Sequence, residues 1–135
     1  MGMTIEQLVK HWEDSADKNY DDMLRIYDAE TNDWALYVGH LCIEKLLKAI
    51  LIKKTKSKEI PLIHNLIRLA KLCGIETTSE MDEKLSEINT FNMEAKYQLE
   101  KREFYKRCTK QYTDKQIRII KEIREWLKEK LMQKS

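Results

Sequence analysis

The stretch LCIEKLLKAIL, residues 41–51, constrains the fold of this chain more than any other feature. Its spacing predicts a helix from Asn32 to about Lys54 with apolar residues on nearly every side. One face carries Leu36, Ile43, Leu47 and Ile50, and the opposite side carries Trp34, Val38, Leu41 and Ile52. A helix of this kind is buried on several sides. We therefore expect it to be the central helix of a bundle or half of a dimer interface.

Three charged residues, Glu44, Lys45 and Lys48, interrupt this apolar helix. An unpaired buried charge costs several kcal/mol, so each of them must be paired or must reach water. Glu44 and Lys48 are one turn apart and share a strip of the helix, while Lys45 lies further round. The charges therefore predict a polar cleft along one side of the helix.

The composition favours helices over sheets. The 135 residues include only 3 Gly and 1 Pro, and 36% are charged, which is typical of long helices with solvated outer faces. Few segments carry the alternation of β-branched residues that a strand needs. We predict an all-α fold, an antiparallel up-and-down bundle of four main helices plus one or two short helices, in a single domain over residues 1–135.

Capping signals divide the rest of the chain into helices. Thr4 with Gln7 forms a capping box for a first helix that ends between Asp28 and Thr31, where Asn32 is the expected N-cap of the second. A short helix follows Pro61 and stops at Gly74, and a fourth begins near Ser79. The last helix is predicted from a cap at Thr113 with Gln116, and its core stripe is Ile120, Ile123, Leu127 and Leu131.

Several function classes lack their sequence signals. The net charge of +2 is too small to indicate nucleic-acid binding by itself. Cys42, Cys73 and Cys108 are scattered without zinc-ligand spacing, and the chain has no glycine-rich phosphate loop or nucleophile motif. We expect no metal and no cofactor. The sequence shows no signal-peptide pattern and no apolar run of membrane-spanning length, so we expect a cytoplasmic protein.

Two groups of residues are candidates for a binding or catalytic site. His40, Glu44 and Lys48 line one strip of the second helix, and His64 lies near the start of the third. They could supply a base, a carboxylate and a phosphate-binding cation. The alternative is an internal Glu–Lys pair beside a hydrogen-bonded histidine.

The second candidate is the segment from residue 92 to residue 112, where cations alternate with aromatic residues. Its members are Lys96, Tyr97, Lys101, Arg102, Tyr105, Lys106 and Arg107. Such a mixture can stack bases and neutralise phosphate. The alternative is a solvated segment whose tyrosines anchor it to the bundle.

Three stretches in order along the chain resemble the HEPN domain family, small helical bundles of prokaryotes and higher eukaryotes. Residues 43–49, IEKLLKA, resemble the family's "EKxLKA" stretch on its second long helix. Residues 61–66, PLIHNL, resemble its "P-x-x-H-[DN]-L" stretch, and Ala95-Lys96-Tyr97 resembles its "A-R-Y-P" stretch. The resemblance covers most of the chain and implies an α-helical bundle, commonly a homodimer, that often works beside a minimal nucleotidyltransferase in toxin–antitoxin-like gene pairs.

The sequence also departs from the family pattern. Many members are RNases with an R-x(4–6)-H motif, but no Arg of this chain precedes a His at that spacing. Lys58 has the right distance from His64, but it is not Arg, and Pro61 lies between them. Lys96 and Gln98 replace the Arg and Pro of the "A-R-Y-P" stretch.

These departures favour a non-catalytic, HEPN-like module of prokaryotic type that binds a nucleotide or a partner. Its partners would be a second copy of the chain, a minimal nucleotidyltransferase, and a nucleotide or RNA ligand, with no membrane involved. The expected ligand-binding residues are Glu44, Lys45, Lys48, His64, Lys96 and Tyr97. The alternatives are an RNase toxin with a non-standard active site, using His64 or His40, and a purely structural dimerisation module.

Overall fold

The fold consists of helices only within residues 2–133, which are the residues that the computed structural model describes. The elements are α1 (Ile5–Asp28), α2 (Asn32–Thr55), α3 (Leu66–Leu72), α4 (Ser79–Asn89), the 3-10 helix η1 (Met93–Ala95), α5 (Gln98–Arg107) and α6 (Lys110–Met132). This confirms the predicted all-α bundle. Three helices, α1, α2 and α6, are long, and the others are short.

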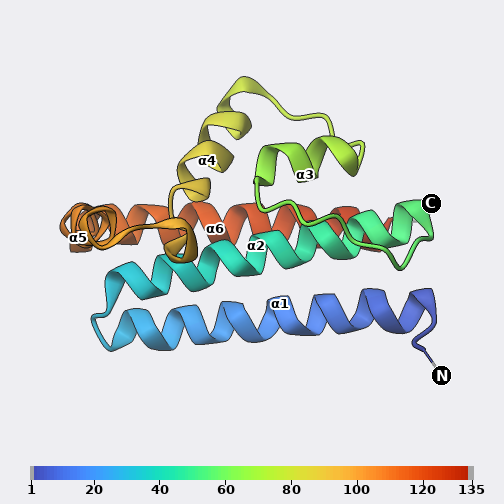
Figure 1. Cartoon of the computed structure of the whole chain (residues 1–135), viewed down its shortest axis with the longest axis horizontal. Helices are drawn as coiled ribbons and strands as arrows, with labels where there is room; N and C mark the ends of the chain where they lie inside the picture. Colours follow the sequence, from blue (N-terminus) through green and yellow to red (C-terminus); the bar gives the residue numbers. More distant parts are fainter. Residues whose placement is uncertain (1, 134–135) are drawn as a thin grey trace.

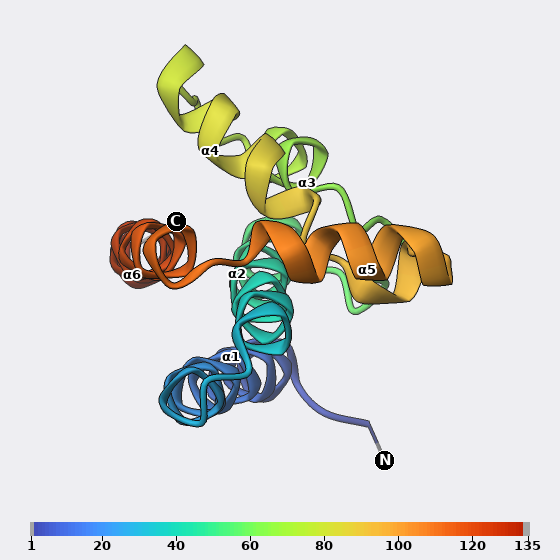
Figure 2. The same ribbon diagram turned by 90° about the vertical axis from the view of Figure 1, so that its left-hand side faces the viewer.

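Helix α2 is the centre of the molecule (Figures 1 and 2). Helix α1 runs antiparallel to it on one side, α6 lies along a second side, and α3 and α4 cover a third. Helix α5 crosses near the first turns of α2 (Figure 2). The apolar residues on nearly all sides of α2 explain this position, because each side is buried by a different neighbour.

Local capping explains most helix ends. Thr4 and Gln7 form the predicted capping box of α1. Asn65 caps α3 by accepting a hydrogen bond from the Arg68 amide, and Gly74 follows α3 with a φ of 71°, a left-handed conformation that glycine adopts without strain. The segment 56–65 between α2 and α3 is not helical. It returns along α2 toward the start of α3, as Figure 1 shows.

Two predicted caps are wrong. The N-cap position of α2 is Thr31, and Asn32 is the first helical residue, where its side-chain amide donates to the carbonyl oxygen of Cys108 at 3.0 Å. The last helix begins at Lys110, and its N-cap is Thr109, four residues before the predicted cap, while Thr113 is buried inside α6. In each case a nearby threonine takes the N-cap position instead: Thr31 lies one residue before Asn32, and Thr109 lies about one turn before Thr113.

The long helices approach each other closely at Gly39. A Cβ atom at this position would lie 2.7 Å from the Cδ1 atom of Ile120 on α6 and 2.7 Å from the Sδ atom of Met23 on α1. Only a hydrogen atom fits between α2 and these two side chains. Gly39 therefore sets the distance at which α1 and α6 pack against α2.

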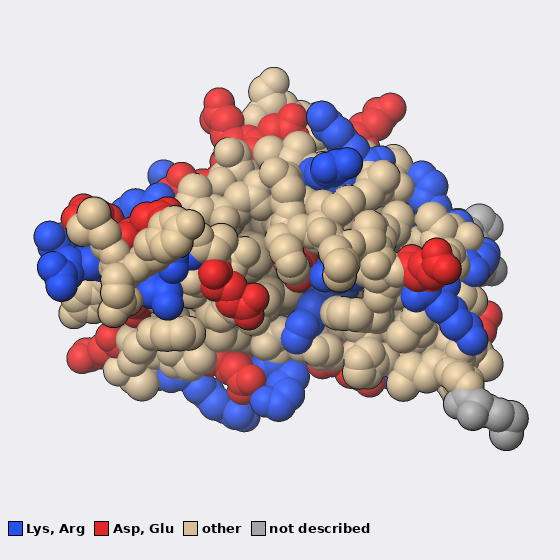
Figure 3. Space-filling view, viewed as in Figure 1, with Lys and Arg blue, Asp and Glu red and all other residues tan. Residues whose placement is uncertain are grey.

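Polar contacts join α1 to α6 beside this core. Asp17 of α1 accepts hydrogen bonds from Arg124 at 3.0 Å and from Lys128 at 2.8 Å. Burial alone would raise the pKa of Asp17, but the bonds and charges of Lys128 and Arg124 outweigh it, and the pKa is lowered. Elsewhere, Lys and Arg side chains are interspersed with Asp and Glu, as Figure 3 shows for one face. Within residues 2–133, no helix combines the length and apolarity required to cross a bilayer.

Candidate ligand-binding site

Glu44 is the centre of a polar cluster inside the otherwise apolar α2. Its side chain is buried, with the residue 5% exposed, and its two oxygens bind different partners. Oε2 accepts a hydrogen bond from Lys48 Nζ at 3.1 Å, and Oε1 lies 3.1 Å from Nδ1 of His64. The predicted strip of α2 and the segment before α3 that carries His64 therefore meet at one carboxylate.

The hydrogen bond to Glu44 orients the His64 ring. A carboxylate oxygen can only accept, so Nδ1 of His64 carries the proton and donates it. This leaves Nε2 as the nitrogen available to a ligand, and the side chain of His64 is 60% exposed. A histidine held by a buried carboxylate and open to solvent is equipped to bind an anion when protonated or to accept a proton when neutral.

His40 lies beside the same carboxylate but is closed to solvent. The residue is 1% exposed, its Nε2 is 4.0 Å from Glu44 Oε1, and neither ring nitrogen has a hydrogen-bond partner within residues 2–133. Its ring stacks on that of Tyr37 with centroids 6.3 Å apart. Burial lowers the pKa of His40, so the ring is neutral at about pH 7. Its burial prevents His40 from contacting a ligand directly.

A hollow of about 270 Å³ opens next to His64. It is lined by His64, Asn65, Asn89, Asn92, Ala95, Lys96 and Glu100. These residues come from the turn before α3, the end of α4, and the segment that leads through η1 into α5. We call this hollow the amide hollow, because three of its lining side chains are asparagines.

Each of the three asparagines turns the oxygen of its side-chain amide toward a backbone N–H group. The Oδ1 atoms of Asn65, Asn89 and Asn92 accept from the backbone amides of Arg68, Leu66 and Glu94 at 3.1, 2.9 and 3.1 Å, respectively. Because only oxygen can accept from these N–H groups, each side chain keeps its NH₂ group as the end that can donate to a ligand. The hollow is therefore rich in hydrogen-bond donors.

Lys96 adds a positive charge to the wall of the amide hollow. Its Nζ atom lies 5.2 Å from the centroid of the Phe104 ring on α5. Burial lowers the pKa of Lys96, and the nearby charge of Arg107 lowers it further. Glu100 also lines the hollow, and its Oε1 accepts from the backbone amide of Tyr97 at the start of α5.

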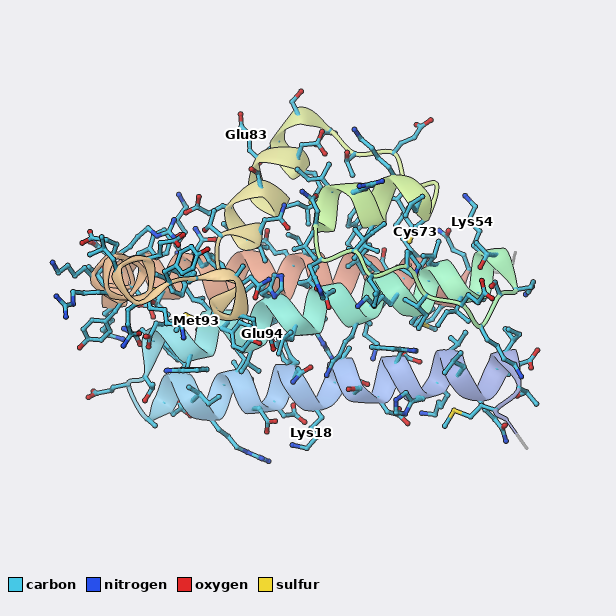
Figure 4. The ribbon with its side chains drawn as sticks, in the orientation of Figure 1. Lys18, Lys54, Cys73, Glu83, Met93 and Glu94 are labelled. Atoms are coloured by element: carbon cyan, nitrogen blue, oxygen red, sulfur yellow. The ribbon has the colours of Figure 1, made fainter. Side chains whose placement is uncertain are left out.

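A hydrogen bond between Tyr37 and Glu94 holds the η1 segment against α2. The hydroxyl of Tyr37 donates to Glu94 Oε1 at 2.9 Å, and Figure 4 shows Glu94 and Met93 where this segment crosses α2. Burial raises the pKa of Tyr37 to about 12, with a further contribution from Glu94. This contact fixes the position of the segment that carries Asn92 and Lys96.

Of the six residues expected to bind a ligand, the structure brings four together. Glu44, Lys48 and His64 form the cluster, and Lys96 shares the amide hollow with His64. Lys45 lies elsewhere, with its Nζ atom 2.8 Å from the Ser15 hydroxyl on α1. Tyr97 is 81% exposed at the N-terminus of α5.

Sequence reasoning missed the three asparagines. Asn65 could have been found, because an asparagine directly before an apolar helical run is a typical N-cap. Asn89 is the last residue of α4 and Asn92 lies in the turn after it, whose course depends on how α4 packs, and no local pattern marks them. No cluster of three or more His, Cys, Asp or Glu residues suited to a metal occurs within the described part of the chain, residues 2–133.

Comparison with known proteins identifies the family of the chain. No curated protein and no solved structure matches the chain significantly. The sequence model of the HEPN domain matches residues 9–131, which span α1 to α6 and include every residue of the polar cluster and of the amide hollow. The chain belongs to the HEPN domain family.

Proposed function

We propose that this chain is a ligand-binding HEPN module that binds a nucleotide, or a nucleotide unit of RNA, at the amide hollow and the adjoining His64–Glu44 pair. The observation that carries the proposal is the donor-rich lining of the hollow. The residues that line it include the three asparagines, whose NH₂ groups are not used by the backbone, together with Lys96 and the exposed His64. Phosphates and base carbonyls present mainly acceptors, so they complement this lining.

The buried charges of the polar cluster are compatible with binding of an anionic nucleotide. Lys48 lies within 3.1 Å of Glu44 and offsets its charge. Glu44 then serves to orient His64 rather than to repel a phosphate. Lys96 is the cation that we expect to contact a phosphate group, and its partly buried position would strengthen such a contact compared with one in open water.

The family resemblance extends the proposal to partners. We propose that the module forms a homodimer and works beside a minimal nucleotidyltransferase, whose nucleotide could be the shared ligand. Co-purification of the chain with a nucleotidyltransferase encoded beside it would support this part. Failure of the two proteins to bind each other, with or without nucleotide, would leave nucleotide binding as a property of the chain alone.

Isothermal titration with ATP, GTP and a short RNA tests the binding proposal. The wild type should give saturable heat with at least one of them, and His64→Ala and Lys96→Ala should weaken that binding. Lys18→Ala is the matched control for Lys96, because Lys18 is an exposed lysine on α1 at the outside of the bundle (Figure 4). A wild type that gives no heat would overturn the proposal, and salt-sensitive dimerisation without ligand binding would then favour a structural module.

RNase activity is a second candidate, and the His64–Glu44 pair favours it. A carboxylate that holds the Nδ1 proton of a histidine leaves Nε2 free to accept a proton from a ribose hydroxyl. His64 is exposed enough to do so, whereas His40 is not. RNA cleavage by the wild type that disappears in His64→Ala and persists in Lys18→Ala would support this candidate. Intact RNA after incubation with the wild type would exclude the RNase candidate and leave ligand binding as the proposed function.

A further inference from the structure

A second hollow lies on the other side of the η1 segment, between the start of α2 and α5. Its volume is about 630 Å³, and it is lined by Asp33, Trp34, Met93, Gln98, Leu99, Lys101, Arg102 and Tyr105. We call it the α2–α5 groove. None of these residues lines the amide hollow, so the groove is a separate feature.

The groove exposes aromatic side chains that do not belong to the core. Trp34 is 46% exposed and Tyr105 is 66% exposed, so each of these large aromatic side chains leaves much of its apolar surface in contact with solvent. Trp34 contacts Tyr37 edge-on, with ring centroids 5.8 Å apart. Tyr37 belongs to the hydrophobic core, so Trp34 borders the core on one edge while much of its ring remains open to solvent. Flat aromatic faces open to solvent are the surfaces on which unpaired bases stack.

Charged groups are placed at different depths in the groove. Asp33 is buried and accepts a hydrogen bond from the backbone amide of Trp34 at 3.0 Å. Arg102 is exposed, and Lys101 is partly exposed. A base can therefore lie inward, where its amino or imino groups could donate to Asp33, while its phosphates face Lys101 and Arg102 at the rim.

We propose that the α2–α5 groove binds a base of a single-stranded nucleic acid, with Trp34 and Tyr105 as stacking surfaces and Arg102 as a phosphate contact. The groove and the amide hollow flank the same segment, residues 92–98, and one strand could occupy both. This proposal goes beyond nucleotide binding at the amide hollow and does not depend on it. An apolar helix of a protein partner fits less well, because it would leave Asp33 and Arg102 desolvated without partners.

Fluorescence anisotropy of a fluorescein-labelled decanucleotide RNA tests the groove. We expect Trp34→Ala and Tyr105→Ala each to weaken binding about tenfold, the loss that removal of one stacking surface causes. Trp34→Phe keeps an aromatic face and should retain most of the affinity. Arg102→Ala should reduce the slope of log affinity against log salt by about 0.7, as expected for one lost phosphate contact to a single strand. The charge-matched control, Lys18→Ala, should leave the slope nearer to that of the wild type.

Intrinsic tryptophan fluorescence supplies an independent measurement. A base stacked on Trp34 should quench emission during the titration, and the quench should be absent in Trp34→Phe although the RNA still binds. Thermal unfolding of each variant checks that the fold is intact. Tyr105→Ala repeats the binding measurement at a second, more exposed position, where loss of the fold is less of a concern.

The outcomes separate the two proposals. Wild-type affinity in both Trp34→Ala and Tyr105→Ala, or no binding of the RNA by the wild type, would overturn the groove proposal. Trp34→Ala should leave ATP and GTP titrations at the amide hollow unchanged, whereas His64→Ala and Lys96→Ala should weaken them. Loss of mononucleotide binding in Trp34→Ala would also contradict the groove as a separate site.

Discussion

Lys48 donates a hydrogen bond to Glu44 across one turn of α2, with both side chains almost completely buried. The Lys48 Nζ atom also lies 5.5 Å from the centroid of the Trp12 ring on α1. The Lys48–Glu44 pair is therefore enclosed by the Trp12 ring on one side and by His64 on another. Removing Glu44 leaves the Lys48 ammonium without its carboxylate partner in a place that is nearly closed to water.

We therefore expect Glu44→Gln to destabilise the fold by about 3 kcal/mol, because the Lys48 ammonium loses its counter-charge. The double variant Glu44→Gln with Lys48→Met removes both charges and should recover much of this loss, since an apolar side chain suits the site. Urea unfolding of the two variants and the wild type measures the difference. A double variant no more stable than the single one would contradict a buried ion pair.

Stability should fall as the pH is lowered, in part because of His40. Burial lowers the pKa of His40 below the ordinary value of 6.5; Glu44 and Glu94 oppose this shift, while His64 and Lys48 add to it. The unfolded chain therefore binds a proton at a higher pH than the folded chain does. Stability that is present above about pH 6.5 is lost as the pH falls toward the folded-state pKa.

The measurement for this prediction is the free energy of unfolding at several pH values for the wild type and for His40→Gln. One titrating group changes the slope of the unfolding free energy against pH by at most about 1.4 kcal/mol per pH unit. Gln does not titrate, so the slope below pH 6.5 should be shallower in His40→Gln, whatever its absolute stability. Equal slopes in the two proteins would show that other groups cause the dependence.

Asn89 offers a way to separate stability from binding. Its Oδ1 atom accepts from the Leu66 amide at 2.9 Å, while its NH₂ group is the one available to a ligand. Asn89→Asp keeps an acceptor for Leu66 but replaces the donor with a negative charge. We expect stability near that of the wild type and clearly weaker nucleotide binding, measured by thermal unfolding and calorimetric titration.

The matched variant is Asn89→Ala, which removes both functions. It should be destabilised by about 1–3 kcal/mol, because the Leu66 amide loses its partner at the start of α3. If Asn89→Asp binds nucleotide as tightly as the wild type, the amide donors of the hollow do not contact the ligand.

Gly39→Ala tests the close packing of the three long helices. Alanine favours a helix more than glycine does, by up to about 1 kcal/mol. Its Cβ would nevertheless meet Ile120 and Met23 at 2.7 Å, so we expect a net loss of about 1–3 kcal/mol. Adding Ile120→Val removes the Cδ1 atom of that contact and should restore part of the stability. A stabilised single variant would mean that α1 and α6 can shift away from α2 without cost.

Much of the fold could be predicted from the sequence, because its signals are local. The apolar stripe of α6, the capping box at Thr4 and the stop at Gly74 depend on neighbours within a few turns, and the structure has all three. The caps at Asn32 and Thr113 were misplaced because competing residues, Thr31 and Thr109, are equally local signals. Only packing against other helices distinguishes the competing positions.

The candidate site could be predicted in part. Helical spacing placed Glu44 and Lys48 on one strip. His64 is a candidate from its place near the start of the third helix, and Lys96 from the alternation of cations with aromatic residues. Spacing could not show that Lys45 lies against Ser15 on α1, because that depends on which side of α2 each neighbour covers. The asparagine lining and the α2–α5 groove depend on the turn between α4 and α5, whose course long-range contacts such as Tyr37–Glu94 determine.

The segment around η1 is a wall that the two hollows have in common. Met93 lines the α2–α5 groove, while Asn92, Ala95 and Lys96 line the amide hollow, and the Tyr37–Glu94 hydrogen bond secures the wall between them. A ligand that displaces this wall from one side alters the affinity on the other. Thermodynamic linkage makes such an effect reciprocal, so each ligand would change the affinity for the other by the same factor.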